Sequence, residues 1–291
     1  MYKELKPPLS YQEQIDLLKS RNLVIEDENF AAKILSHINY YRLSAYGLGL
    51  HAGDNKFKDN IKFDMLYRLY EFDVKIRYIL LQAIEFTEIM FRTKISYHMA
   101  MKYGSDCYLD AQFFQKADFH EDFVAAFEME KYHQRDTAFI KHHNETYGGK
   151  MPIWVAVEVF PFGMLSRFYW NMIIEDQREI ANCFNTTPVF IRSWLKCLVD
   201  VRNICAHYGR IYNRILSSEP KMYSEHRHIP QRRIFAIILI LKRLLNNLTA
   251  QKNFVFNIIT LIEEYEDVIN LSYIGFPEDW SKLLGEFIIS K

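Results

Sequence analysis

Apolar residues recur at helical spacing along most of the chain. Between residues 64 and 103 they return every three or four positions, and this stretch contains no glycine and no proline. That spacing places the apolar side chains on one face of a helix. The sequence therefore predicts a long amphipathic helix here, either unbroken or as two helices in succession, closed by Gly104 and Ser105.

Other helices are predicted from the residues at their ends. Ser10 and Glu13 have capping-box spacing ahead of a first helix. Thr187 followed by Pro188 is a typical start for a helix that runs toward His207. Further helices are expected over residues 30–38, 120–146, 229–248 and 254–269. Because no segment alternates with period two, the predicted fold class is all-α, a multi-helix bundle with an N-terminal helical extension and a long central helix.

Domain organisation is less strongly marked than the helices. The chain of 291 residues is long enough for one large domain or two small ones. It shows neither an internal repeat nor a clear linker. We expect an N-terminal helical segment over residues 1–60 and a larger helical domain over residues 61–291, and a single domain is the alternative.

Composition narrows the class of protein. Hydrophobic residues make up 49% and charged residues 25%, which is typical of a globular chain. The longest wholly apolar run, Ile234 to Leu241, is far shorter than the roughly 20 residues that a membrane helix needs. The first residues lack the apolar stretch of a secretory signal. The four cysteines form no CxxC pair and have no zinc-finger spacing. We expect a cytoplasmic protein with reduced thiols and no membrane segment.

Charge is balanced overall but not locally. Basic residues gather over 192–214 and 221–243, and acidic residues gather after residue 262, although the net charge is zero. A basic middle suits a site for a polyanion on one face of the molecule. The alternative is a pair of ordinary solvated helix faces.

One stretch concentrates groups that carry chemistry. Arg202, Asn203 and His207 have the spacing R-N-x-x-A-H. Arg202 and His207 are five residues apart, about 140° around a helix axis, so one helix does not aim both at one point. Two such helices related by a two-fold axis would supply an arginine and a histidine each to a shared cleft.

These side chains suit RNA cleavage without a metal. Histidine has an unperturbed pKa of about 6.5 and can take or give a proton near neutrality. Arginine is always charged and binds a phosphate through two hydrogen bonds. We expect His207 to transfer protons, Arg202 to stabilise the phosphate and Asn203 to orient His207 by a hydrogen bond. Arg210, Asn213 and Arg214 follow and are candidates for holding flanking phosphates.

Structural interpretations compete with the catalytic one. If the stretch were simply a helix end, Arg202 would pair with Asp200 or an acidic neighbour, and His207 would cap carbonyls. Glu88 and Arg92 form an ordinary helical ion pair or else orient Arg202.

A second acidic residue also has two interpretations. Glu158 lies in an apolar run, and a buried carboxylate there would need a partner such as Arg202 or Arg210. Trp194, Leu198 and Tyr212 flank the motif and are candidates for apolar contacts between two copies of the chain.

Several segments together resemble one family. The stretch VRNICAHYGRIYNR resembles the signature of the Abi family of phage-resistance proteins, whose domain is similar to HEPN ribonucleases. Further segments that resemble family blocks are residues 6–14, 38–44 and 152–166.

The resemblance implies an all-helical HEPN-like fold and a homodimer that cuts RNA, with the catalytic roles on Arg202, Asn203 and His207. An RNA or protein antitoxin is a further candidate partner, and we expect no cofactor and no metal. The alternative function is a non-catalytic helical dimer that binds RNA or protein in phage defence.

Overall fold

The computed structural model describes residues 5–245 and 249–285. In this part of the chain the strands are β1 (His51–Gly53) and β2 (Lys56–Phe57), which pair antiparallel. The α-helices are α1 (Tyr11–Ser20), α2 (Glu28–His37), α3 (Tyr40–Ser44), α4 (Phe63–Tyr103), α5 (Ala117–His133), α6 (Ala138–Tyr147), α7 (Ile153–Val159), α8 (Phe162–Asn171), α9 (Ile174–Asn182), α10 (Pro188–Ala206), α11 (Ile234–Leu244), α12 (Thr249–Glu264) and α13 (Trp280–Leu284). The predicted all-α class is confirmed.

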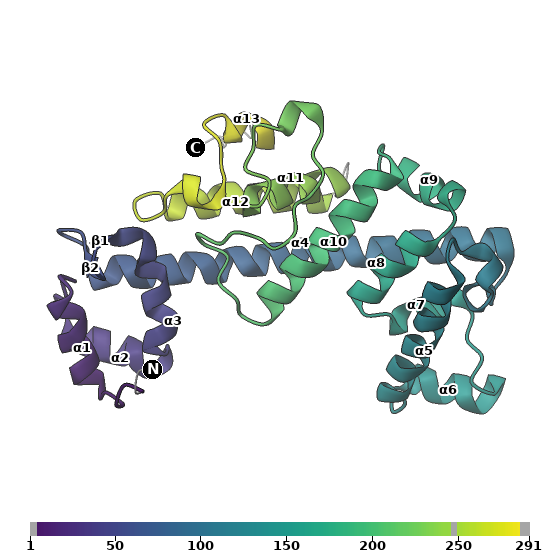
Figure 1. Cartoon of the computed structure of the whole chain (residues 1–291), viewed down its shortest axis with the longest axis horizontal. Coiled ribbons are helices and arrows are strands. Elements are labelled where there is room, and N and C mark those ends of the chain that lie inside the picture. The colour runs from purple at the N-terminus through teal and green to yellow at the C-terminus, as the bar shows by residue number, and fades with distance from the viewer. Residues whose placement is uncertain (1–4, 246–248, 286–291) are drawn as a thin grey trace, which may run out of the picture.

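The long predicted helix is a single element. α4 has 41 residues, which corresponds to about 60 Å at 1.5 Å per residue. It ends at Gly104, whose φ of 98° is easily adopted by glycine and whose N–H donates to the carbonyl of Ala100. Figure 1 shows α4 as the axis along which the other elements are arranged. The unbroken alternative is therefore the correct one.

The other helices form groups around this axis. Figure 1 shows α1–α3 and the small hairpin at one end of α4, and α5–α8 near its other end. α11 and α12 pack along another side, and α10 crosses α4 between the two end groups. The C-terminal end of α10 therefore lies near the middle of the molecule. The predicted domain boundary near residue 60 stays a prediction.

Two helix starts follow their sequence signals. The N–H of Ser10 donates to the Glu13 carboxylate at 2.7 Å, and the N–H of Glu13 donates to Ser10 Oγ at 3.3 Å, so the capping box is present. α10 begins at Pro188 after Thr187, as predicted, although the Thr187 side chain makes no capping hydrogen bond.

Three predicted helix spans were wrong in their bounds. The helix expected over residues 254–269 begins at Thr249 and ends at Glu264 as α12, where the N–H of Tyr265 donates to the carbonyl of Ile262 in a turn. The segment expected as one helix over residues 120–146 forms α5 and α6, because a turn intervenes in which Thr137 Oγ1 and N–H both donate to the carbonyl of Gln134. The helix expected from residue 229 begins only at Ile234, because the preceding residues form a turn in which the N–H of Arg233 donates to the carbonyl of Pro230. Its expected last residues, 246–248, lie outside the described residues.

The most apolar run of the chain belongs to the core. Nine of the eleven residues of α11 are buried. In the described residues, no helix combines the length and the apolar character that crossing a membrane requires. The four cysteines are all free, as expected, and Cys183 alone is exposed.

Candidate functional site at the C-terminal end of α10

The R-N-x-x-A-H stretch lies on the last turn of α10 and the turn that follows. His207 is the C-cap residue. The N–H of Tyr208 donates to the carbonyl of Cys205 at 3.1 Å, and the N–H of Gly209 donates to that of Ile204 at 2.7 Å. This pair of bonds is the Schellman pattern, which satisfies the last carbonyls of a helix.

An unusual backbone conformation follows His207 directly. Tyr208 has φ of +57° in the left-handed region, although its side chain is bulky. Such a residue costs about 1–3 kcal/mol and persists only where its surroundings hold it. Arg42 of α3 holds it here, because its guanidinium donates to the carbonyl of Tyr208 at 2.6 Å. At Gly209 an added Cβ would lie 3.0 Å from the carbonyl oxygen of Ile204, which favours glycine.

A buried carboxylate fixes the next residues of the turn. Asp73 of α4 is fully buried, and one of its oxygens accepts from the backbone N–H of Ile211 at 2.8 Å and of Tyr212 at 2.6 Å. Its other oxygen accepts from the hydroxyl of Tyr46 at 2.7 Å. The turn after α10 is therefore tied to α4 by a group that belongs to the core.

Arg77 completes this contact. Its guanidinium forms an ion pair with Asp73 and donates to the carbonyl of Gly209 at 3.5 Å. Burial raises the pKa of the Asp73 carboxyl, and the charge of Arg77 opposes that rise. Sequence reasoning missed Asp73 and Arg77. Their signal was two charges spaced four apart on the apolar face of the long helix, where a buried charge needs a partner.

The three motif side chains are less constrained than the backbone beneath them. Arg202 is half-buried, whereas Asn203 and His207 are exposed. The guanidinium of Arg202 donates to Asn203 Oδ1 at 3.2 Å. The expected side-chain hydrogen bond between Asn203 and His207 does not occur among the described residues, although the N–H of His207 donates to the backbone carbonyl of Asn203 at 3.0 Å. The Asn203 side chain thus contacts the arginine of the motif instead of its histidine.

The helix-end interpretation of Arg202 is not what the structure shows. Asp200 accepts hydrogen bonds from the hydroxyls of Ser217 and Ser218. Among the ion pairs of the described residues, none includes Arg202. Its charge therefore has no carboxylate partner within that part of the chain.

The residues expected to hold flanking phosphates also serve the local backbone. Arg210 donates to the carbonyl of Ala45, in the 3-10 helix that follows α3. Arg214 is exposed and donates to the carbonyl of Arg210 at 3.4 Å. Asn213 Oδ1 accepts from Arg233 at 3.3 Å. A role of Arg210, Asn213 and Arg214 in phosphate binding stays a prediction.

Glu88 and Arg92 hold a different part of the molecule. Arg92 is buried, pairs with Glu88, and donates to the carbonyl of Val157 and, at 2.5 Å, to that of Phe160. These carbonyls lie at the C-terminal end of α7 and just beyond it. The contacts support the structural interpretation of this pair, and none of them reaches Arg202.

Two expectations about burial were wrong. Glu158 is exposed, so it is not a buried carboxylate that needs Arg202 or Arg210. α7 turns it outward while its apolar neighbours face the core. The residues expected at an interface between copies are buried within one chain: Trp194, Leu198 and Tyr212.

Other apolar side chains near the motif do face solvent. The exposed fraction is 66% for Tyr208, 61% for Ile215 and 84% for Tyr41. Tyr41 precedes Arg42, which contacts the turn itself. Apolar surface for a contact around the motif is thus present, on residues that the sequence reasoning did not choose.

Metal ligands do not cluster in the described part of the chain. It contains no group of three or more histidine, cysteine, aspartate or glutamate side chains placed to hold a metal ion. The motif side chains at the end of α10 are an arginine, an amide and an imidazole.

Comparison with known families identifies one match. The model of the family of Abi-like proteins matches residues 33–213. The match covers α3 with Arg42, all of α4, and the R-N-x-x-A-H stretch with the turn that follows it. A comparison with curated proteins and one with solved structures each give no match.

Proposed function

The chain belongs to the Abi-like protein family, and from that premise we propose that it is a metal-independent endoribonuclease of the HEPN type. Family membership supports a role in phage defence by abortive infection. The ribonuclease activity is supported by the residues at the end of α10. Its substrate is RNA, and its active form is a homodimer.

The observation that carries this proposal is a contrast within the site. The backbone of the turn is fixed by Asp73 and Arg42, which come from distant parts of the chain. The side chains of Asn203 and His207 nevertheless face solvent, and Arg202 has no acidic partner in the described residues. A preorganised catalytic site needs a backbone held in place and polar side chains that remain available to bind a substrate.

The reaction needs a base, an acid and a cation. The imidazole of one His207 takes the proton of the ribose 2′-hydroxyl, and the 2′ oxygen attacks the adjacent phosphorus. The bond from phosphorus to the 5′ oxygen breaks, and that oxygen takes a proton from a second acid. Arg202 stabilises the extra negative charge on the phosphate. The products are a 2′,3′-cyclic phosphate and a 5′-hydroxyl.

A second copy of the chain supplies the missing acid. Each chain has a single His207, which starts the reaction as either a base or an acid. Two copies packed about a two-fold axis would bring equivalent histidines and arginines into one cleft. Tyr208 and Ile215 replace the buried residues Trp194 and Leu198 as candidates for the apolar contacts of that interface.

A cleavage assay on the purified chain tests this function. Wild type should cut RNA in EDTA, leave the cyclic product, and spare an all-deoxy strand that lacks the 2′-hydroxyl. His207→Ala and Arg202→Ala should be inactive, whereas His133→Ala, an exposed histidine at the end of α5, should remain active. Cleavage of the deoxy strand, or full inhibition by EDTA, contradicts the mechanism.

A mixing experiment tests the shared site separately. Excess His207→Ala chains should poison wild-type activity if each site uses both copies. Activity that falls only in proportion to the wild-type fraction, or an active monomer, argues against the composite site.

An RNA or protein antitoxin is proposed here as a further partner. Its addition should reduce the cleavage activity of the dimer.

A non-catalytic dimer that binds RNA or protein is the second candidate. A row of large apolar side chains is exposed along one side of α4, and this favours a protein contact there: Tyr78, Phe86, Ile89, Tyr97 and Met101. In that case RNA or a partner would bind while the cleavage assay shows no product with any variant.

A further inference from the structure

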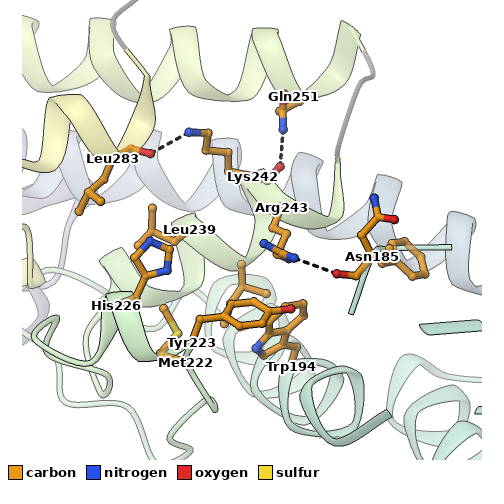
Figure 2. Close-up of a pocket in the computed structure, with 12 residues that line it drawn as sticks. Asn185, Trp194, Met222, Tyr223, His226, Leu239, Lys242, Arg243, Gln251 and Leu283 are labelled. Atoms are coloured by element: carbon orange, nitrogen blue, oxygen red, sulfur yellow. Dashed lines mark hydrogen bonds between the residues drawn. The ribbon is translucent and has the colours of Figure 1, made fainter. Parts of the chain in front are cut away.

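A cavity lies beside α11, away from the end of α10. It has a volume of about 370 Å³ and is bounded by α10, the C-terminal half of α11, the start of α12, α13, the segment after α9 and the segment around Tyr223. Figure 2 shows Lys242 and Arg243 of α11 on one side, and Met222, Tyr223 and His226 on the other. A cavity of this size suits a small molecule.

Two cationic side chains at the end of α11 have hydrogen-bond donors that the described residues do not all use. Lys242 Nζ donates to the carbonyl of Leu283 at 2.7 Å (Figure 2), which uses one of the three donors of an ammonium group. Arg243 donates from Nη2 to the carbonyl of Asn185 at 2.8 Å. The Nε of Arg243 is buried and has no hydrogen-bond partner among the described residues.

The charge of the cavity is not balanced by acids. The described residues that line it include no aspartate and no glutamate. Glu225 is the nearby acid, and its pKa is lowered by its own backbone N–H and further by Ser224, His226 and Arg243. Its carboxylate is exposed and does not line the cavity. Burial lowers the pKa of Lys242, and a bound anion would oppose that change.

The remaining wall is apolar and aromatic. The ring of Tyr223 stacks on Phe190, with 4.3 Å between centroids, and the guanidinium carbon of Arg243 lies 4.3 Å from the centre of the same Tyr223 ring. Met222 and Leu239 line the cavity beside them. A flat guanidinium held against a ring offers a surface on which a planar base stacks.

We propose that this cavity binds a nucleotide. Lys242 holds the phosphate, the planar base lies against the guanidinium of Arg243 and the apolar wall, and the side-chain amide of Asn185 at the rim contacts its edge. The site is independent of the proposed ribonuclease activity. Trp194, which lines the cavity, and His207 are thirteen residues apart on α10, which is about 20 Å along a helix.

Binding to the full-length chain tests this proposal. Isothermal titration with the four ribonucleoside 5′-monophosphates should give one site per chain for at least one of them. The matching nucleoside and inorganic phosphate should each bind about tenfold more weakly or worse, because each lacks half of the contacts. No binding by any nucleotide, or phosphate that binds as well as the nucleotide, overturns the proposal.

Variants separate this cavity from the motif. Lys242→Met should weaken binding by about tenfold or more, and Met222→Trp should block it by filling the cavity without removing a charge. Lys252→Met, an exposed lysine on α12, is the matched control and should bind normally. Arg202→Ala should also bind normally. Loss of binding in Arg202→Ala with retention in Lys242→Met and Met222→Trp would place the nucleotide at the motif and overturn the assignment.

Discussion

Two acid–arginine pairs on α4 have the same spacing, but the acid makes the closer contacts with a distant backbone segment in one pair, and the arginine makes them in the other. Asp73 and Arg77 are four residues apart, as are Glu88 and Arg92, and all four side chains are largely removed from solvent. In the first pair the acid makes the closer long-range contacts, because Asp73 accepts from two backbone N–H groups of the turn after α10 at 2.8 and 2.6 Å, whereas Arg77 donates to the carbonyl of Gly209 at 3.5 Å. In the second the arginine makes it, because Arg92 donates to two carbonyls around the end of α7.

The difference lies in which backbone groups each region leaves unpaired. A turn that follows a helix exposes N–H groups, and these need an acceptor such as a carboxylate. A helix C-terminus exposes carbonyls, and these need a donor such as a guanidinium. The same pair of residue types therefore stabilises the proposed catalytic turn in one place and a scaffold helix in the other.

The largest effect on stability is expected from Asp73→Ala. It removes the acceptor of Ile211, Tyr212 and Tyr46 and leaves the charge of Arg77 buried without its partner. The free energy of unfolding should fall by about 3–5 kcal/mol, measured by urea denaturation, and cleavage should be lost. A variant with near wild-type stability would show that the turn does not depend on this carboxylate.

Arg92→Met should have a smaller effect on stability and a different effect on activity. Two carbonyls around the end of α7 lose their donor, while Glu88 keeps partial access to water. We expect a loss of about 1–3 kcal/mol in the same denaturation experiment. RNA cleavage at a temperature where the variant is folded should continue. If cleavage fails there, the pair acts on the motif after all.

Tyr208→Gly should change stability by less, and in the opposite direction. Glycine adopts the left-handed conformation without strain, and this gain exceeds its larger entropy in the unfolded chain. The free energy of unfolding should rise by about 1 kcal/mol. Tyr208→Asn is the matched variant, because asparagine also tolerates this conformation. A decrease in both would mean that the tyrosine ring makes a stabilising contact.

His207→Ala should change stability least. The side chain is exposed, so the free energy of unfolding should stay within about 0.5 kcal/mol of wild type. Cleavage should nevertheless fall by about 10²- to 10⁴-fold, the usual contribution of acid–base catalysis. A clear drop in melting temperature would instead assign His207 a structural role.

Features set by neighbouring residues were predictable from the sequence. The capping box at Ser10, the uninterrupted periodicity of α4 and the start of α10 at Pro188 each depend on a few adjacent residues. The position of Arg202, Asn203 and His207 at the end of a helix was predictable for the same reason.

Features set by distant residues were not predictable. Asp73 meets the turn after α10 across 138 residues of sequence, and no local pattern marks that meeting. Glu158 shows a second limit. Neighbours on a helix point about 100° apart, so an apolar run on either side of a residue does not bury it. Trp194 is buried and contacts Tyr223 and the carbonyl of Lys221, and α10 as a whole packs against α4, α8 and α9. The sequence of α10 alone does not reveal these neighbours.

The contacts of the turn also determine when it forms. Arg42, Asp73 and Arg77 reach it across 132 to 166 residues of sequence. Closing such long loops has an entropic cost that contacts within one helix do not have. Because α4 ends at residue 103, the growing chain holds all of α4 before it holds any residue of the turn. The contacts that fix the turn can form only once residue 212 has been synthesised, after about three quarters of the chain.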